Sequence, residues 1–325
     1  MRALESIGNP LLWAGFVAFV LAMLALDLGV FHREAHAVGR REALVWSGVW
    51  VGLALLFGAG VWWSFGSERG LEFLTGYLIE KSLSIDNVFI FVILFGALGI
   101  PVAYQHRVLF WGILSALVLR AAMIFAGAAL LERFHALIYV FGGFLVLTGI
   151  KLLLERGKES HPEKSWPMRL AMRMIPSTPR LAGDRFTTLE NGRRVATPLF
   201  MALLMVEFTD LVFALDSIPA IFAVTRDPFI VFTANIFAVL GLRSLYFLLA
   251  DFVDRFRHLK VGLASVLVFV GAKMAAVDVV KVDPLVSLGI IASLLGASML
   301  VSWRGARPRN SAGRIADERA DRSLA

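Results

Sequence analysis

Two stretches of this sequence place ionisable side chains inside long apolar segments. The first is Glu80-Lys-Ser-Leu-Ser-Ile-Asp-Asn-Val-Phe89, and the second is Glu207-Phe-Thr-Asp-Leu-Val-Phe-Ala-Leu-Asp-Ser-Ile-Pro-Ala220. Each contains a pair of acids six residues apart, Glu80 with Asp86 and Asp210 with Asp216. Both lie in apolar runs that exceed the ~20 residues a helix needs to cross a bilayer. The fold must therefore accommodate these acids within lipid.

The composition is that of a membrane protein. Hydrophobic residues make up 58% of the 325 positions and charged residues 18%, against roughly 45–50% and about 25% in soluble domains. Segments that are long and apolar enough to cross the bilayer cover residues 10–31, 44–65, 71–99, 107–131, 135–155, 195–224, 229–252, 261–279 and 284–303. The sequence predicts an all-α polytopic membrane protein with about nine transmembrane helices.

The composition also narrows the chemistry. The sequence contains no cysteine, which excludes disulfides, thiolate metal sites and cysteine nucleophiles. All six histidines lie in or beside polar connections, so oxygen atoms are the main candidates for metal ligands at membrane depth. The net charge of +7 is spread over short loops without a nucleic-acid-binding motif. We expect membrane lipids, and no nucleic acid, as partners of the basic residues.

The distribution of Lys and Arg predicts the orientation, because cytoplasmic loops carry the excess of basic residues. Of the 32 Lys and Arg, 22 fall on one side of the predicted membrane and five on the other. This places the N-terminus outside and the C-terminus in the cytoplasm. Residues 1–303 would form the transmembrane domain and 156–194 a cytoplasmic loop, in which 166–175 is either a basic amphipathic segment or a charged linker. Residues 304–325 would be a basic, disordered cytoplasmic tail.

Polar positions recur in the same order in residues 71–155 and 195–279. The matches are Glu80 with Asp210, Asp86 with Asp216, Leu119-Arg120 with Leu242-Arg243, Glu132-Arg133-Phe134 with Asp254-Arg255-Phe256, and Gly149-Ile150-Lys151 with Gly271-Ala272-Lys273. Each group has three crossings, so the second enters the membrane from the opposite side. The sequence predicts two inverted three-helix repeats, helices three to five and six to eight, a construction that puts transporter substrate sites between the repeats.

Five carboxylates within the predicted helices are the candidate metal ligands. They are Glu80, Asp86, Glu207, Asp210 and Asp216. An Asp at a helix centre costs ~2.5–3.5 kcal/mol even on the mildest insertion scale, so these residues need compensation or a use. In one continuous helix Glu207 and Asp216 would lie ~180° apart. Pro219 predicts a helix break near Asp216 to Pro219 that would resolve this, and the repeat alone suggests a matching break around Ser82 to Asn87.

Further polar residues could complete the site or neutralise it. Supporting oxygen donors are Asn87, Ser82, Thr209, Ser217 and Asn235, and candidate charge partners are Lys81, Arg120 and Arg243. Such hard donors suit Mg²⁺, Ca²⁺ or Mn²⁺. The bases could instead form a static network with the acids, and Asn235 could simply bridge to another helix. The five acids exceed the three bases, however, and protonation or a divalent cation could offset the surplus. A cation or proton pathway is the favoured interpretation.

The two opening stretches, with Ile221-Phe-Ala-Val-Thr-Arg-Asp-Pro-Phe-Ile-Val-Phe232 and Gly241-Leu-Arg-Ser-Leu-Tyr-Phe247, resemble the TerC family and especially its Alx branch. The resemblance covers roughly residues 10–303. It implies a bacterial inner-membrane protein that exports Mn²⁺, protecting the cytoplasm from excess and supplying the metal to exported proteins. The family's functional acidic positions match the five carboxylates. Manganese is implied by the resemblance, whereas the residues themselves indicate a hard divalent cation.

Two other functions compete with transport of a divalent cation by alternating access, with protons as a coupling ion. A membrane scaffold that assists metal insertion or secretion without transport would use the same residues. An intramembrane aspartyl protease with Asp86 and Asp216 as its dyad lacks the usual Tyr-Asp and Gly-x-Gly-Asp contexts, so no enzymatic activity is expected. The sequence leaves open the preference among Mn²⁺, Ca²⁺, Fe²⁺ and Mg²⁺, the coupling ion and the oligomeric state.

Overall fold

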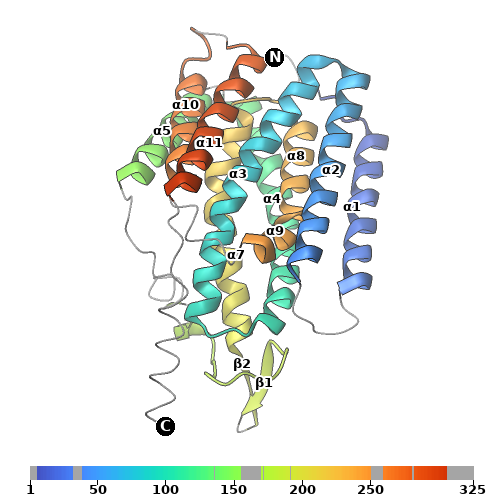
Figure 1. Cartoon of the computed structure of the whole chain (residues 1–325), viewed down its shortest axis with the longest axis vertical. Coiled ribbons are helices and arrows are strands. Elements are labelled where there is room, and N and C mark those ends of the chain that lie inside the picture. Colours follow the sequence, from blue (N-terminus) through green and yellow to red (C-terminus); the bar gives the residue numbers. More distant parts are fainter. Residues whose placement is uncertain are drawn as a thin grey trace.

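The computed structural model describes residues 6–31, 39–134, 136–154, 170, 172–190, 192–249, 259–279 and 282–305. Its helices are α1 (Pro10–Phe31), α2 (Arg40–Phe65), α3 (Ser67–Ala97), α4 (Val102–Arg133), α5 (Leu137–Leu154), α7 (Pro198–Phe222), α8 (Pro228–Leu240), α9 (Leu242–Leu249), α10 (Leu259–Ala275) and α11 (Pro284–Gly305). The strands β1 (Thr187–Glu190) and β2 (Arg193–Ala196) form an antiparallel hairpin below the helices (Figure 1).

Long apolar helices confirm an all-α polytopic membrane protein. Within the described residues, five helices are long and apolar enough to cross a bilayer, namely α2, α4, α5, α7 and α11. The bent pair of α8 and α9 makes a sixth. α3 is 31 residues long, but it carries Glu80, Lys81 and Asp86 in its centre. The apolar helices confirm the class of fold, whereas nine crossings remain a prediction.

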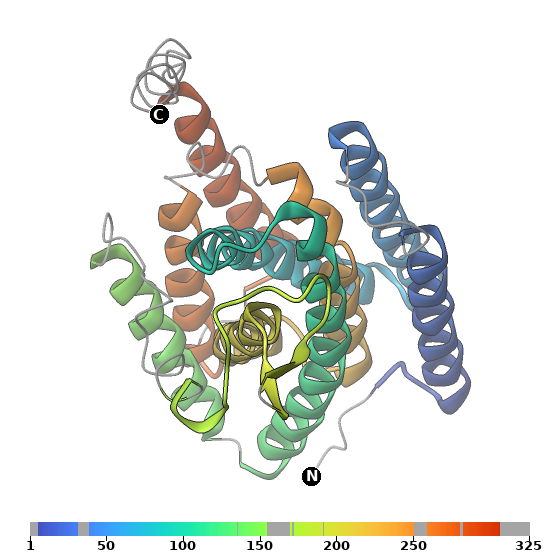
Figure 2. The same cartoon turned by 90° about the horizontal axis from the view of Figure 1, so that it is seen from below.

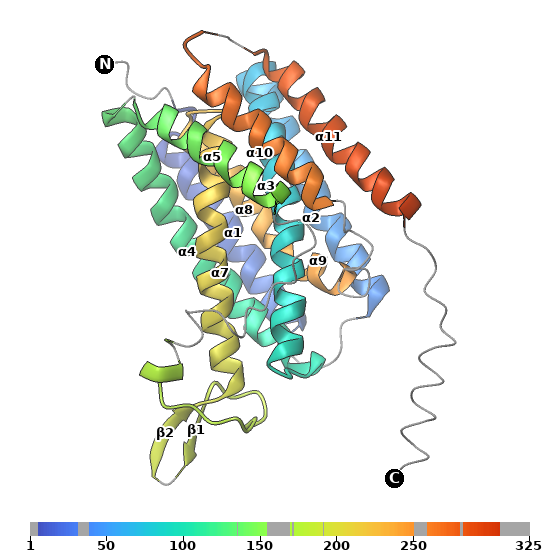
Figure 3. The same cartoon turned by 90° about the vertical axis from the view of Figure 1, so that its left-hand side faces the viewer.

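The helices form a bundle around α3 and α7, which lie in the centre when the molecule is seen from below (Figure 2). α3 packs against α7 and α8, and α7 packs against α4. α5 lies along α10, with α11 on the outer side of α10 (Figure 3). The helices α1 and α2 flank the bundle on the opposite side (Figure 2). The long central helices α3 and α7 are therefore shielded on most sides by other helices.

An aromatic cluster attaches α1 to the bundle. The ring centroid of Phe16 in α1 lies 5.6 Å from those of Phe57 in α2 and Phe237 in α8. It also lies 5.8 Å from that of Phe232 in α8. Aromatic pairs at such separations add about 0.5–1.5 kcal/mol each beyond the burial of their area. This packing holds α1 against α8.

Glycines allow α5 and α10 to approach closely. A Cβ atom added to Gly142 would lie 2.8 Å from the carbonyl oxygen of Gly271, and one added to Gly149 would lie 2.7 Å from that of Ala264. Small residues at a helix crossing are the common way to bring backbones together in membrane proteins, where lipid supplies no hydrophobic drive between helices. Larger side chains at these positions would push α5 and α10 apart.

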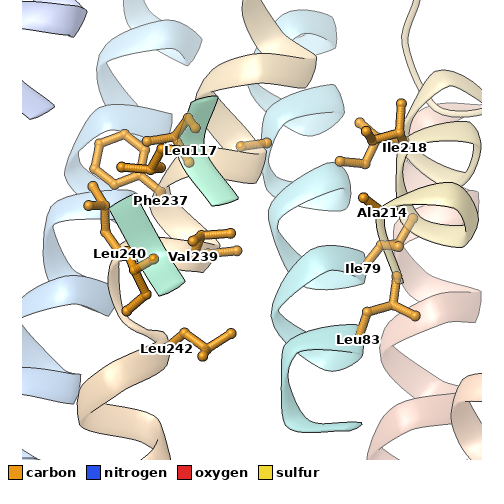
Figure 4. Close-up of a cluster of buried hydrophobic side chains, with 14 of the residues drawn as sticks. Ile79, Leu83, Leu117, Ala214, Ile218, Phe237, Val239, Leu240 and Leu242 are labelled. Carbon is orange, nitrogen blue, oxygen red and sulfur yellow. The ribbon is translucent and has the colours of Figure 1, made fainter. Parts of the chain in front are cut away.

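Apolar side chains fill the space between the central helices (Figure 4). Ile79 and Leu83 of α3 point toward Ala214 and Ile218 of α7. On the other side of α3, Leu117 of α4 lies beside Phe237 of α8. All five of these larger side chains are buried. Any charged group at the same depth is therefore surrounded by a medium that cannot solvate it.

The helix break expected near Pro219 is wrong. α7 runs unbroken from Pro198 to Phe222 with Pro219 inside it, and Ala223 N still donates to the Pro219 carbonyl at 3.0 Å. Pro219 lies in the last turn, so it removes only the backbone hydrogen bond to Leu215. Helices in membranes tolerate such prolines where neighbouring helices support them.

The matching break around Ser82 to Asn87 is also wrong. α3 is continuous from Ser67 to Ala97. The hydroxyls of Ser82 and Ser84 donate to the carbonyls of Leu78 at 2.6 Å and Glu80 at 2.8 Å. These bonds follow the helical pattern from each residue to the fourth residue before it, and the sequence here contains no proline to interrupt it.

The break that the structure contains lies at Gly241. α8 and α9 meet there at an angle of 40°. A Cβ atom on Gly241 would lie 3.1 Å from Cβ of Trp50 and 2.8 Å from Nζ of Lys81. Glycine therefore permits both the break and the close approach of Lys81.

The hairpin lies at the end of the predicted loop 156–194 and was not expected. Its strands pair Thr187 with Ala196 and Glu190 with Arg193, and Gly192 lies between the two strands. Gly192 has a φ of 75°, the left-handed conformation that hairpin turns of this length favour in glycine. Half of the segment 166–175 (residues 166–169 and 171) lies outside the described residues, and the predicted tail lies outside them from residue 306 onward.

Candidate metal centre

Arg120 of α4 joins carboxylates from the two central helices. Its Nε and Nη2 donate to the two carboxylate oxygens of Asp210 in α7 at 3.0 and 2.8 Å. Its Nη1 donates to Oε2 of Glu80 in α3 at 3.0 Å. Glu80 and Arg120 are 1% exposed and Asp210 is 3% exposed. The predicted match between Glu80 and Asp210 thus corresponds to two acids that meet at one guanidinium.

Asn235 of α8 completes this group, which we call the Arg120 cluster (Glu80, Arg120, Asp210 and Asn235). Its Nδ2 donates to Oε1 of Glu80 at 2.7 Å, and the residue is fully buried. The other amide atom, Oδ1, has no hydrogen-bond partner among the described residues. Asn235 therefore faces the site, and its free oxygen is an additional hard donor.

The charges of the cluster do not balance. With both carboxylates ionised, Glu80, Arg120 and Asp210 carry a net charge of −1 in a buried position. A buried ion pair is stable only when its geometry is good and its remaining donors and acceptors are satisfied. The two-pronged contact between Arg120 and Asp210 meets this requirement. The residual negative charge favours the approach of a further cation.

Glu207 lies one turn nearer the hairpin than Asp210 on α7 and faces α4. Its Oε1 accepts a short hydrogen bond from the hydroxyl of Ser115, and the residue is half-buried. A Cβ atom on Gly112 would lie 3.9 Å from Glu207 Oε1. Glu207 is therefore close to the Arg120 cluster along α7 but is held by a different partner.

Asp216 faces a third helix. It interacts with the hydroxyl of Thr148 and with the charge of Lys151, both in α5. Because α7 is unbroken, Asp216 stays on the face opposite Glu207, as the helical period requires. The structure thus brings together Glu80 and Asp210, but not Glu207 or Asp216. The side chain of Asp86 lies outside the described part of the molecule.

The supporting residues divide into two groups. Ser82 and Thr209 donate to backbone carbonyls of their own helices, Thr209 to Met205 at 2.6 Å. Asn87 Oδ1 and Ser217 Oγ are buried and have no hydrogen-bond partner among the described residues. Uncompensated burial of a polar atom is costly, so these two oxygens are free to accept a ligand.

The other two predicted charge partners lie near the break at Gly241. Lys81 is half-buried and, within the described residues, it forms no ion pair. Its ammonium group approaches Gly241, at the C-terminal end of α8, where the partial negative charge of the helix end favours a cation. Arg243 is 5% exposed at the start of α9. Among the contacts that the structure describes, the ion pairs of Glu80 and Asp210 are with Arg120.

Two cavities differ in size along α3 and α7. A cavity of about 10 Å³ is lined by Asp210 and by Gly112, Ala116 and Val206 among others, and has room for about one water molecule. A second cavity, of about 620 Å³, opens at the end of the bundle opposite the hairpin. We call it the end cavity; its polar lining is Glu68, Arg69, Glu72, Thr225, Arg226, Lys273 and Asp283.

The end cavity contains functional candidates that the sequence analysis missed. Glu72 is 8% exposed. Its Oε2 accepts from Arg69 Nη1 at 3.0 Å and from Thr225 Oγ1 at 2.9 Å. The signal for Glu72 in the sequence is the same as for Glu80, a carboxylate within the apolar segment 71–99. Among the described residues, no group of three acids or histidines converges closely enough to hold a metal ion alone.

Comparison with known protein families identifies the family of this chain. The model of the integral membrane protein TerC family matches residues 65–310. The chain belongs to the TerC family. The match includes the Arg120 cluster and the end cavity. The resemblance stated from the two opening stretches is thereby confirmed.

Membrane proteins of several bacteria match over nearly the whole chain. A protein of Myxococcus xanthus called "Uncharacterized membrane protein STKORF319" is 68% identical, over 93% of this chain and 95% of its own length. Proteins of Salmonella typhi and Escherichia coli (strain K12) called "Putative membrane-bound redox modulator Alx" are each 46% identical, over 92% of this chain and 96% of their own length. The Alx-like character of the chain is therefore shown. No solved structure matches it significantly.

Proposed function

We propose that this TerC protein transports a hard divalent cation, with Mn²⁺ exported from the cytoplasm as its cargo. The observation that carries this proposal is the meeting of Glu80 and Asp210, from different central helices, in the buried middle of the bundle. Two carboxylates with the free amide oxygen of Asn235 are the ligand types that Mn²⁺, Mg²⁺ and Ca²⁺ prefer. Asp86, Glu207 and Asp216 would serve as further stations along the route.

An inverted repeat, with helices α3 to α5 related to α7 to α10, is part of the proposal. Under this relation Gly149 corresponds to Gly271, and Gly142, seven residues earlier, to Ala264. The two close approaches at the α5–α10 crossing join Gly142 to Gly271 and Gly149 to Ala264. Exchanging the two repeats turns the first of these contacts into the second. Contacts across a two-fold axis behave in this way. The pairings of α3 with α8 and α4 with α7 exchange in the same way.

The unequal cavities support transport by alternating access. The end cavity reaches Glu72 from the side opposite the hairpin, whereas the space on the Asp210 side holds about 10 Å³. A transporter exposes its central site to one side at a time as its repeats move. With nine crossings, an outside N-terminus and a cytoplasmic C-terminus, the end cavity would face the outside. Protons that compete for the same carboxylates would couple their own movement to that of the cation.

The redox role in the name of the Alx relatives needs another chemistry in this chain. The sequence has no cysteine, so thiol and disulfide exchange are unavailable to it. Carboxylates and amides bind cations but do not exchange electrons. Cation transport is therefore the function that these residues support.

Mn²⁺ flux in proteoliposomes tests the proposal. We expect the wild-type protein to move Mn²⁺, and Glu80→Gln and Asp210→Asn to abolish the flux. Each variant leaves Arg120 one carboxylate partner, so it should remain folded. Glu190→Gln, on the hairpin, is the control that should transport normally. If folded wild-type protein moves no divalent cation, the scaffold hypothesis replaces transport; if both site variants transport normally, the site is wrong.

A further inference from the structure

Arg120 occupies the position in which a cation would contact Glu80 and Asp210. Three hydrogen bonds of 2.8 to 3.0 Å direct its guanidinium at both carboxylates. The neighbouring cavity that Asp210 lines is about 10 Å³, so it has room for a water molecule but not for a hydrated metal ion. A metal ion and the guanidinium therefore cannot both contact the two carboxylates in this conformation.

The net charge of the buried group decides which ions can replace the guanidinium favourably. With Arg120 in place the buried group carries a net charge of −1. Replacing Arg120 by a monovalent cation leaves −1, so nothing is gained and the hydrogen bonds of Arg120 are lost. Replacing it by a divalent cation gives zero. Because buried charge without compensation is strongly unfavourable, only the second exchange improves the balance.

From this balance we infer that Arg120 is a tethered competitor of the transported ion and sets the selectivity of the site for divalent over monovalent cations. The inference rests on the proposed function. A divalent cation displaces the guanidinium from Glu80 and Asp210 toward the carboxylate of Glu207, one turn along α7 from Asp210, and the free Oδ1 of Asn235 supplies a third oxygen. When the cation leaves, the guanidinium of Arg120 returns and offsets the repulsion between the two carboxylates. A monovalent cation cannot displace it.

Mn²⁺ binding to purified protein tests this role. Free Mn²⁺ is measured by electron paramagnetic resonance during titration of wild type, Arg120→Lys and Arg120→Gln, each with and without excess Na⁺. The Gln variant should bind Mn²⁺ at least tenfold more tightly than wild type, and Na⁺ should compete in this variant alone. The Lys variant keeps the charge but loses the planar two-pronged contact, so its affinity should lie between the other two.

Loss of Arg120 could also destabilise the protein, and this can be separated from the binding role. The Gln variant should unfold at a lower temperature without Mn²⁺ and recover on addition of Mn²⁺, which binds only the folded state. The double variant Glu80→Gln/Arg120→Gln restores the net charge of −1 and should bind Mn²⁺ more weakly than the single Gln variant. Should the Gln variant fail to fold even with Mn²⁺, the order of affinity of Arg120→Lys and wild type decides.

Two results would overturn the inference while leaving transport intact. One is unchanged or weaker Mn²⁺ binding in Arg120→Lys and Arg120→Gln when wild-type protein transports Mn²⁺. The other is equal exclusion of Na⁺ by wild type and Arg120→Gln. Absence of Mn²⁺ flux in wild type, by contrast, would remove the proposed function itself.

Discussion

The Arg120 cluster and the end cavity use the same elements in different surroundings. In each, an arginine contacts a glutamate of α3, Arg120 with Glu80 and Arg69 with Glu72. The Arg120 pair is 1% exposed on both sides, whereas the side chain of Arg69 is 27% exposed beside a cavity of about 620 Å³. Water can replace a lost partner in the cavity but not in the cluster.

This difference in exposure indicates where selectivity and access reside. Glu72 and Glu80 are eight residues apart on one helix, or about 12 Å along its axis. A cation at Glu72 can keep part of its water, whereas one at Glu80 must exchange water for protein oxygens. Selection is therefore expected at the Arg120 cluster, and the end cavity should mainly admit or release ions.

The largest expected effect is a difference in stability between the two arginines. Arg120→Gln leaves two buried carboxylates together and should lower the free energy of unfolding by ~3–5 kcal/mol. Arg69→Gln should cost about 1 kcal/mol or less, because its ion pair adjoins solvent. Unfolding in detergent without metal ions compares them. Equal losses would mean that the two sites do not differ in hydration.

A second prediction concerns the crossing of α5 and α10, away from the Arg120 cluster. Gly142→Ala places a Cβ atom 2.8 Å from the Gly271 carbonyl, so α5 and α10 must separate. Overpacking of this kind costs ~1–3 kcal/mol, and Mn²⁺ flux should fall with it. Gly143→Ala is the matched control, because a Cβ atom there meets nothing within 4 Å. Identical thermal stability of the two variants would contradict the close crossing.

A smaller effect is expected from the acid of the end cavity. Glu72→Gln weakens the contacts with Arg69 and Thr225 and should reduce Mn²⁺ flux several-fold without abolishing it. Glu68→Gln removes one charge from the same cavity without touching those hydrogen bonds, and should have less effect. Flux is compared over a range of Mn²⁺ concentrations. Complete loss in Glu72→Gln would place an essential site in the end cavity.

The smallest perturbation tests access alone. Because the chain has no cysteine, single cysteines can be introduced without further changes. Thr225→Cys lines the end cavity and Ala116→Cys lines the small cavity beside Asp210. A membrane-impermeant thiol reagent applied from outside should label the first and not the second. Labelling of Ala116→Cys from outside would show that the small cavity beside Asp210 is accessible from that side, contrary to the account.

The sequence indicated that buried acids and bases would meet in the bundle, but not which of them. Glu80 and Asp210 match in the predicted repeat, and Arg120 is a base within the predicted helices, so a contact between them agrees with charge compensation in lipid. The hydrogen bond from Asn235 to Glu80 faces the site and also joins α8 to α3, so it fits both alternatives stated for that residue.

Other features depend on packing that the sequence does not display. Pro219 does not break α7, because a proline in the last turn removes a single hydrogen bond. Gly241, at the break, lies against Trp50 and Lys81, which come from distant parts of the chain. Because α7 is unbroken, Asp216 faces α5 and does not join Glu207. The local sequence signal for the hairpin is the dipeptide Asn191-Gly192, which is typical of hairpin turns.

The position of bound Mn²⁺ tests the central claim most directly. A structure determined by electron cryomicroscopy at saturating Mn²⁺ should show the ion between the carboxylates of Glu80 and Asp210, with the guanidinium of Arg120 displaced from both. Under the same conditions, Mn²⁺ bound elsewhere with Arg120 still contacting Glu80 and Asp210 would contradict the account.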